Sequence, residues 1–445
     1  MQDFTHGHVG RQILNFAIPM LIGNVFMQLY QFADTVIVGR ILGKEALAAV
    51  GAATPVVFLT VALIAGMGIG ASIVISQYFG AKQYDRVRVT CDTLFIFLLG
   101  ASVVMTLLGI FFAEDVLRLM GLQEDTLPLA KTYLQIYFGG LILLFAYNSV
   151  AAILRGVGDS KTPLYFLIIS SVLNVGLDLI FILWFGWGVA GAAWATVISQ
   201  GVAFILSVIY INRTNPIIRI ELFNPVFDRE IFRECVKLGL PTGMQQAFVA
   251  IGLMALMGVV TSFGTDTLAA YVSVNRIDTF ISLPVMNLAA ALTSFVGQNI
   301  SVGNFDRIKA GLKATLKMSL LTCAVLNTAI IIFGKQLMLL FTADANVIET
   351  GYELLVIINC SYFIFAVMFT VNGLLRGAGA AIFPMIITLL SLWLIRLPLA
   401  AFLSQYWGET GIWVAMPAGW LIGAAASLAY YYSGRWKTKA VVKAN

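Results

Sequence analysis

The chain has 445 residues, of which 60% are hydrophobic and only 11% are charged. Its mean hydropathy of +0.92 leaves too little polar surface to cover a water-soluble protein of this length. We therefore expect a polytopic membrane protein, and we interpret the net charge of +5 as a sign of membrane topology rather than of nucleic-acid binding.

Twelve apolar runs follow one another along the chain, each long enough for a helix of about 20 residues to cross a bilayer. Their continuity favours helices over the alternating strands of a β-barrel. The first run is too long for the apolar part of a cleavable signal peptide, so we expect it to remain in the protein. The runs lie near residues 13–40, 46–78, 92–113, 127–153, 163–185, 189–211, 236–262, 268–300, 308–333, 350–374, 382–403 and 411–432.

The basic residues predict the orientation of these spans. If both termini are cytoplasmic, the inner loops, tails and helix ends hold 20 of the 27 Lys and Arg residues, ending with Lys443. The outer side then holds five, and Arg276 and Arg396 fall inside spans. This distribution follows the positive-inside rule for an even number of spans.

The two halves of the chain repeat each other. The segment SQYFGAKQYDRVR after the second run returns as GQNISVGNFDRIK, so that Arg86 matches Arg307, 221 positions later. The segment LRGVG before the fifth run returns as LRGAG with the same offset. An even number of spans in each half makes the halves parallel repeats, an arrangement typical of transporters.

We therefore expect an all-α membrane protein with twelve transmembrane helices in two pseudo-symmetric six-helix bundles. The predicted N-lobe covers residues 1–212 and the predicted C-lobe covers residues 232–445, with a polar cytoplasmic linker at 213–231. Within the second run, the glycines of GMGIG at 66–70 are expected to allow close helix packing rather than to bind phosphate.

Two aspartates interrupt apolar runs in the first half only. Asp34 lies in LYQFADTVIVGR and Asp178 lies in SSVLNVGLDLIFI, whereas the matching positions in the second half are Ala255 and Leu399. Each aspartate comes six residues before the predicted outer end of its span, which is about 9 Å along a helix. Acids at this depth are costly and usually functional, so we expect the pair to meet inside the N-lobe.

Two carboxylates close together in a low-dielectric interior cannot both be ionised cheaply, which suits a proton carrier. Their oxygens, together with the nearby polar side chains, would equally suit Na⁺, and the sequence does not separate the two ions. A purely structural role for the aspartates is the alternative, as is helix–helix hydrogen bonding for the neutral polar residues. These neighbours are Tyr30 and Asn174, one turn from Asp34 and Asp178, with Asn148 and Thr196 on the fourth and sixth spans.

Other charged and reactive residues are assigned mainly structural roles. We expect Arg396 to form a salt bridge with Asp278, with binding of an anionic substrate as the alternative. The four cysteines are scattered without metal or disulfide spacing, and no cofactor is predicted beyond the coupling ion.

Taken together, the twelve spans, the duplicated halves, LYQFADTVIVGR, LRGVGDSKTP and NVGLD resemble the multidrug and toxic compound extrusion (MATE) family. The resemblance covers nearly the whole chain. It implies a V-shaped pair of bundles that exports cationic, lipophilic compounds in exchange for H⁺ or Na⁺. The implied partners are small cationic drugs and membrane lipid, with no nucleic acid, and a monomer in the cell membrane is expected.

The DinF-like branch of the family places its coupling site in the N-lobe, and this implies roles for individual residues here. Its cation-coupling residues fall on Asp34, Asp178, Asn174, Thr196 and Tyr30, with Asn148 as a further match, and Gln28 lies near the span 1 glutamine of the family. Tyr30, Asn148, Asn174 and Gln28 are the implied substrate-binding residues, and Na⁺ would bind at Asp34, Asp178, Asn174 and Thr196. The middles of spans 7 and 10 lack the acids of the NorM-like pattern, so coupling in the N-lobe is favoured.

Three alternative functions remain open. A channel is possible on composition, although the asymmetry of the two lobes favours a carrier. A lipid-linked oligosaccharide flippase shares the duplicated plan, but it would be expected to have two more spans and several basic residues in its cavity. A membrane-embedded enzyme would need clustered catalytic residues within spans, whereas the histidines, His6 and His8, lie in the N-terminal tail.

Overall fold

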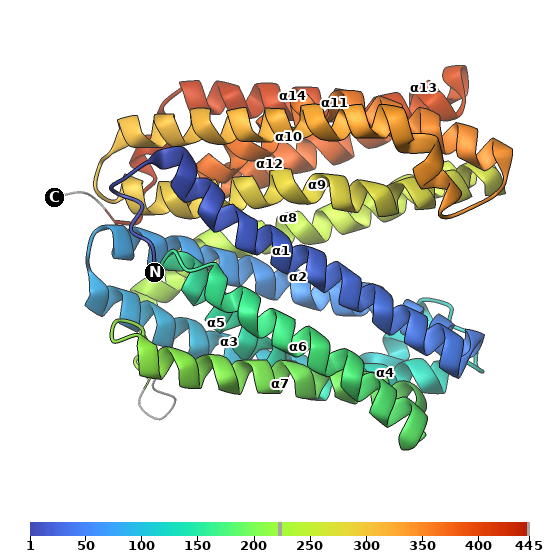
Figure 1. Ribbon diagram of the computed structural model, residues 1–445, viewed down its shortest axis with the longest axis horizontal. Helices are drawn as coiled ribbons and strands as arrows, with labels where there is room; N and C mark the ends of the chain where they lie inside the picture. The colour runs from blue at the N-terminus through green and yellow to red at the C-terminus, as the bar shows by residue number, and fades with distance from the viewer. Residues whose placement is uncertain (221–224, 443–445) are drawn as a thin grey trace. The chain divides into compact units, whose positions relative to one another are not determined.

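The computed structural model describes residues 1–220 and 225–442, and in these residues every regular element is helical (Figure 1). Residues 221–224 of the predicted linker and the end of the predicted C-lobe, including Lys443, lie outside the described residues. Eleven described helices are long and apolar enough to cross a membrane, and a bent pair of helices forms a twelfth span. The predicted all-α, twelve-span fold is confirmed.

The chain divides into two compact units. The first unit comprises Met1–Gln2 and Ile22–Gly243, and the second comprises Asp3–Leu21 and Met244–Asn445. The first half of helix α1 therefore belongs to the second unit, and the start of α8 belongs to the first. The residue ranges of the two units therefore do not coincide with those expected for the lobes.

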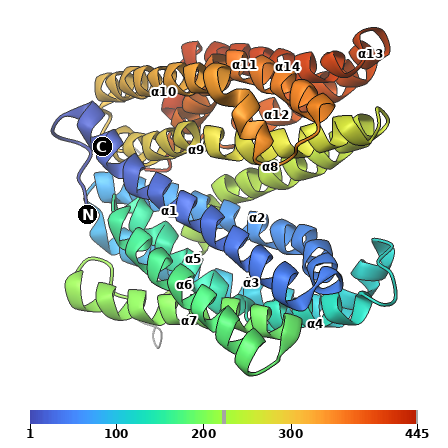
Figure 2. The same cartoon turned by 45° about the vertical axis from the view of Figure 1, so that its right-hand side comes forward.

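Most helices of the first repeat extend beyond the apolar runs, because the polar residues at the ends of these runs are also helical. In the first unit α6 and α7 lie side by side, and α5 packs against α2, α3 and α7 (Figures 1 and 2). The elements are α1 (Val9–Ile37), the π-helical turn η1 (Val38–Leu42), α2 (Lys44–Gly80), α3 (Tyr84–Leu119), α4 (Leu127–Gly139), α5 (Leu141–Gly156), α6 (Lys161–Leu179), the π-helical turn η2 (Ile180–Trp184) and α7 (Gly188–Thr214).

In the second repeat, α11 packs against α9, α10 and α14, which lie around it in both views (Figures 1 and 2). A seven-residue π-helical segment, η3, interrupts the eleventh span. The elements are α8 (Arg229–Thr261), α9 (Thr265–Ile300), α10 (Phe305–Leu339), α11 (Ala345–Gly377), α12 (Ile382–Leu389), η3 (Leu390–Arg396), α13 (Leu397–Trp407), α14 (Glu409–Tyr432) and the 3₁₀ turn η4 (Arg435–Thr438).

A short extended segment precedes α1 and anchors in the second unit. Phe4 is fully buried against Phe16 and Phe295, and its backbone N–H donates to Gln298 Oε1 at 2.8 Å. Arg307 donates to the carbonyl oxygens of Phe4 at 2.7 Å and Gly7 at 2.8 Å. We name residues 3–8 the N-terminal strap.

The corresponding segment before α8 anchors in the first unit. Asp228 pairs with Arg86 at 3.2 Å, and its backbone N–H donates to Thr93 Oγ1 at 3.1 Å. The N–H of Val226 donates to Asp92 Oδ2 at 3.3 Å. We name residues 225–228 the linker strap. The repeated arginines at 86 and 307 thus hold equivalent straps, which gives the sequence repeat a structural reason.

The glycines of GMGIG permit a very close approach of α2 and α8 within the first unit. A Cβ on Gly66 would lie 2.3 Å from the Cα of Gly243, and one on Gly70 would lie 2.4 Å from the N of Gly239. The expected helix-packing role is confirmed.

Candidate functional site

Asp34 and Asp178 lie near the ends of two helices of the first unit that both lose regular geometry. Asp34 is on α1 shortly before η1, and Asp178 is on α6 shortly before η2. The two π-helical turns pack against each other, and the two carboxyl groups are close enough to interact electrostatically. The structure therefore brings together the two aspartates that the repeat comparison singled out. Single π-helical turns within spans are frequent at functional sites.

Three carboxyl oxygens of this pair are buried without a hydrogen-bond donor. Asp178 is fully buried, and neither of its oxygens has a partner; Asp34 is partly buried, and its Oδ1 is buried without a partner. Two ionised carboxylates are acceptors only, so neither satisfies the other. Leaving such groups unsatisfied costs about 1–3 kcal/mol each and more when they are charged. The site can hold a proton shared between the carboxyl groups or a small cation between them.

The amide of Asn174 extends the site one turn below Asp178. Asn174 is buried and its Nδ2 donates to Thr196 Oγ1 at 3.3 Å, whereas its Oδ1 is buried and unpartnered. Thr196 Oγ1 in turn donates to the carbonyl of Ala192 at 3.1 Å, which leaves the hydroxyl oxygen available as an acceptor. The expected contact between spans 5 and 6 is therefore present, and every group near the pair offers oxygen.

Tyr30 interacts electrostatically with both aspartates and with further tyrosine hydroxyls. Tyr133 and Tyr137 on α4 and Tyr147 on α5 are within electrostatic range of Tyr30, and Tyr133 is also within range of the carboxyl pair. Tyr133 and Tyr137 stack with ring centroids 6.3 Å apart. These tyrosines were not predicted, although YLQIY places two of them one turn apart on a single helix face.

Two other predicted residues are less clearly connected to the pair. Asn148 donates to the carbonyl of Leu144 one turn earlier on its own helix at 2.8 Å, and Gln28 is partly buried. Gln200, which was not predicted, lies one turn after Thr196 and is buried with an unpartnered Oε1. The sequence signal for Gln200 was its position four residues after Thr196, on the same face of the helix.

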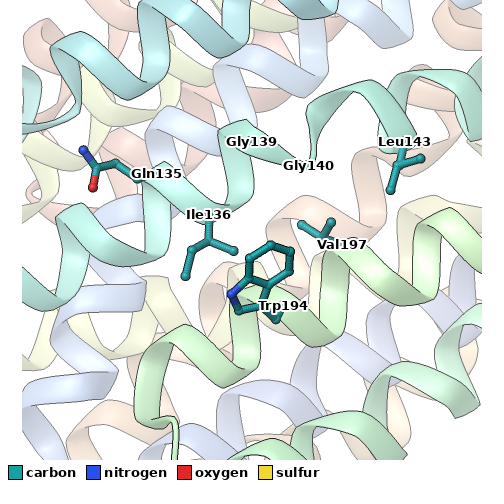
Figure 3. Close-up of a pocket in the computed structure, with 7 residues that line it drawn as sticks. All are labelled: Gln135, Ile136, Gly139, Gly140, Leu143, Trp194 and Val197. Atoms are coloured by element: carbon teal, nitrogen blue, oxygen red, sulfur yellow. The ribbon is translucent and has the colours of Figure 1, made fainter.

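The span that carries Tyr133, Tyr137 and Tyr147 is bent. The helices α4 and α5 meet at an angle of 51° at Gly139 and Gly140, and a hollow of about 400 Å³ opens at the bend (Figure 3). Trp194 and Val197 of α7 face this hollow (Figure 3). A Cβ on Gly140 would lie 2.2 Å from Val197 Cγ2, so glycine is required where the bent span contacts α7.

The second unit contains a different arrangement of charges. The salt bridge expected between Arg396 and Asp278 is wrong, since no N–O distance of 4.0 Å or less joins these two described residues. Asp278 Oδ1 instead accepts a hydrogen bond of 2.5 Å from Tyr362 Oη, a contact that was not predicted. Glu353 is exposed and accepts from Thr410 Oγ1 at 2.7 Å.

Among the described residues no group of three or more His, Cys, Asp or Glu side chains is arranged to hold a metal ion. All four cysteines are unpaired, and three of them are buried, which agrees with the structural role expected for them. The candidate site therefore contains two carboxyl groups, with the oxygens of neutral side chains near them.

A duplicated helical membrane protein with a carboxyl pair buried in one repeat has the architecture of a secondary transporter. The MatE family model matches the chain twice, at residues 19–180 and 241–402, so the chain belongs to the MATE family of transporters. This finding confirms the resemblance seen in the sequence and the expectation that the protein is not an enzyme.

Individual relatives agree over almost the full length. The probable multidrug resistance protein YpnP of Bacillus subtilis (strain 168) is 35% identical over 98% of this chain and 97% of its own. YoeA of the same organism, also named a probable multidrug resistance protein, is 32% identical over 98% of this chain and 96% of its own. A solved outward-facing MATE transporter of the MOP superfamily superposes with a TM-score of 0.91 at 25% identity and covers 98% of each chain.

Proposed function

We propose that this protein is a secondary active multidrug efflux antiporter that exports cationic, lipophilic compounds in exchange for H⁺ or Na⁺ by alternating access. The names of its relatives support drug export. The proposed location is the cell membrane, with both termini cytoplasmic and one chain as the functional unit. The match of the MatE model to both halves favours this function over the flippase alternative.

The observation that carries the coupling proposal is the set of four unpartnered oxygens of Asp34, Asp178 and Asn174. In the unloaded state, the negative charge of the pair favours occupancy of the transporter by a cationic drug. Loading of a proton or Na⁺ from outside removes one negative charge from the pair, weakens that attraction and releases the drug. The ion drives export because it binds one of the two conformational states of the transporter more tightly than the other. That difference in affinity is what shifts the equilibrium between the two states.

The test uses purified protein in liposomes with a pH-sensitive dye inside and ethidium as the drug. Addition of ethidium should drive proton release through the wild-type protein, and Asp34→Asn should abolish that release while the protein remains folded. Glu353→Gln is the matched control because it removes an exposed carboxylate from the other unit. Antiport that continues unchanged in the Asp34 variant would defeat the assignment.

The ion is identified in the same liposomes by imposing ΔpH or ΔNa⁺ separately. Proton coupling is expected to respond to ΔpH alone, whereas sodium coupling is expected to respond to ΔNa⁺ at equal pH. The oxygen ligands described above suit either ion, because Na⁺, like other hard cations, prefers oxygen donors.

A further inference from the structure

A row of lysines lies on the first turns of helix α10 in the second unit. Lys309, Lys313 and Lys317 follow one another at four-residue spacing, so they are neighbours along one stripe of the helix. All three are exposed, and the single acid of α10, Asp306, pairs with Lys309 at 3.1 Å. Within residues 1–220 and 225–442, Lys313 and Lys317 have no ion pair. The stripe therefore presents two uncompensated positive charges.

The same stripe becomes apolar towards the middle of the span. The next two positions at this spacing are Leu321 and Val325, which are 64% and 62% exposed. Between Lys317 and Lys335 the helix carries no charged residue over roughly 27 Å, at 1.5 Å per residue. This length is close to the hydrocarbon thickness of a bilayer, about 30 Å. Lys317 therefore lies at the depth of lipid phosphate groups, and the two apolar residues lie at the depth of acyl chains.

Neighbouring segments of the same unit add positive charge beside the stripe. Lys437 of η4 lies over the ring of Phe305, the first residue of α10, at 5.6 Å from the ring centroid. The start of α1 is also close, because a Cβ on Gly10 would be 3.8 Å from the Cβ of Ala314. The residue after this glycine, Arg11, is exposed. Basic residues from three separate segments of the chain thus surround this end of α10.

The position that matches Lys313 in the first repeat has a different role. It is Asp92, 221 residues earlier, which is buried and accepts a hydrogen bond from the N–H of Val226 in the linker strap at 3.3 Å. The matching N–H in the N-terminal strap is that of Thr5, and it donates to Asp3 Oδ1 at 2.8 Å instead. The second unit therefore satisfies this N–H of its strap without residue 313, and the exposed lysine is a feature of this repeat alone.

These features select a class of ligand. The positive-inside rule requires basic residues at this side of the membrane, but it does not require a regular spacing that continues into an exposed apolar stripe. Lysine binds phosphate as a point charge, and clusters of basic residues beside a span attract anionic lipids. A soluble anion would use the lysines alone, whereas a phospholipid also covers the apolar part of the stripe.

We propose that α10 binds an anionic phospholipid, with the phosphate between Lys313 and Lys317 and the acyl chains along Leu321 and Val325. The bound lipid should stabilise the second unit, because it compensates the charges of the stripe and covers its apolar continuation. This inference goes beyond the proposed transport function, since it requires neither a particular coupling ion nor a particular drug.

Two lipids that differ only in their headgroup test the proposal. Purified, delipidated protein in detergent is mixed with equal amounts of palmitoyl-oleoyl phosphatidylglycerol and palmitoyl-oleoyl phosphatidylcholine, and the bound lipid is identified by native mass spectrometry. The wild type should bind phosphatidylglycerol preferentially. In Lys313→Gln with Lys317→Gln, this binding should weaken about twentyfold, because each lysine beside an anionic headgroup contributes about fivefold in affinity. Binding of phosphatidylcholine should not change.

Two further double variants separate a site from an effect of net charge. Lys82→Gln with Lys161→Gln is the matched control, since it removes the same charge from two exposed lysines of the first unit and should leave lipid binding unchanged. Lys313→Arg with Lys317→Arg keeps both charges and should keep the preference for phosphatidylglycerol. All of these side chains are exposed, so thermal unfolding without lipid should be the same in every variant.

The outcomes are distinct. Equal binding of the two lipids by the wild type, or unchanged binding of phosphatidylglycerol after Lys313→Gln with Lys317→Gln, would overturn the inference. An equal loss in the control variant would assign the effect to net charge and would also overturn it. Glycerol 1-phosphate carries the phosphate without acyl chains; if it raised the unfolding temperature as much as phosphatidylglycerol does, the site would bind a free anion rather than a lipid. No transport is measured, so each of these results leaves the proposed function standing.

Discussion

Replacement of Asp178 by Asn should separate ion coupling from stability. Asp178 is fully buried and both of its oxygens lack donors, as does Oδ1 of the neighbouring Asp34. An amide at position 178 has nearly the same shape as a carboxylate. It cannot take up a proton, and it has no negative charge to attract a cation. We therefore expect Asp178→Asn to lose ion-driven export.

The sizes of both effects follow from the site. One coupled proton moving down a gradient of one pH unit supplies about 1.4 kcal/mol, which sustains roughly a tenfold drug gradient. The variant should fall to a ratio of about one. The new amide supplies N–H donors beside carboxyl oxygens that lack them, and one net hydrogen bond is worth about 0.5–1.5 kcal/mol. Its thermal stability should therefore equal or exceed that of the wild type.

The assay combines two measurements on the same preparation. Ethidium accumulation in inside-out vesicles is followed under an imposed pH or Na⁺ gradient, and thermal unfolding is followed in detergent. Glu353→Gln should change neither quantity. Normal export by Asp178→Asn would refute the coupling role, and a large loss of stability would refute the reasoning that this site lacks donors.

Two further variants test the packing of the units. Gly70→Ala should destabilise the first unit by about 1–3 kcal/mol, because the new Cβ would meet backbone atoms of α8 that cannot move aside. Gly68→Ala is the control: its new Cβ would have its nearest neighbour at 3.3 Å, and the variant should be nearly neutral in thermal unfolding. Equal stability of the two variants would contradict this account. Arg307→Ala should release the N-terminal strap at a cost of roughly 2–3 kcal/mol, seen as faster proteolysis near residue 8, because it removes charged donors from several carbonyls. Lys309→Ala removes an exposed ion pair and should change proteolysis little, so similar digestion of the two variants would argue against the strap.

Much of the fold was predictable because a bilayer imposes long apolar runs that can be read directly. The span count followed from these runs, and the carboxyl pair followed from the rarity of acids within them and from the comparison of the repeats. Asn174 was expected near Asp178 from its helical spacing and Thr196 from its place on the sixth span, and the structure joins the two by a hydrogen bond. These inferences needed only local periodicity and the duplicated pattern.

Other features depend on contacts that a single sequence does not encode locally. The tyrosines around Tyr30 come from α4 and α5, whose bend at Gly139 and Gly140 sets which faces turn inward. The Arg396 salt bridge was predicted from opposite charge and similar depth, but a hydroxyl from α11 competes for the carboxylate. The π-helical segments were not predicted, since their extra residue per turn leaves no mark in the hydropathy pattern.

The straps also bear on how such a chain can be divided. Each compact unit is completed by the leading portion of the opposite repeat, residues 3–21 in one case and residues 229–243 in the other. A polypeptide cut within the linker should therefore yield halves that are unstable alone and regain structure when produced together. By the same logic, a single-repeat ancestor with this arrangement would have been an obligate dimer in which each copy lent the first part of its first helix to the other, as in domain swapping.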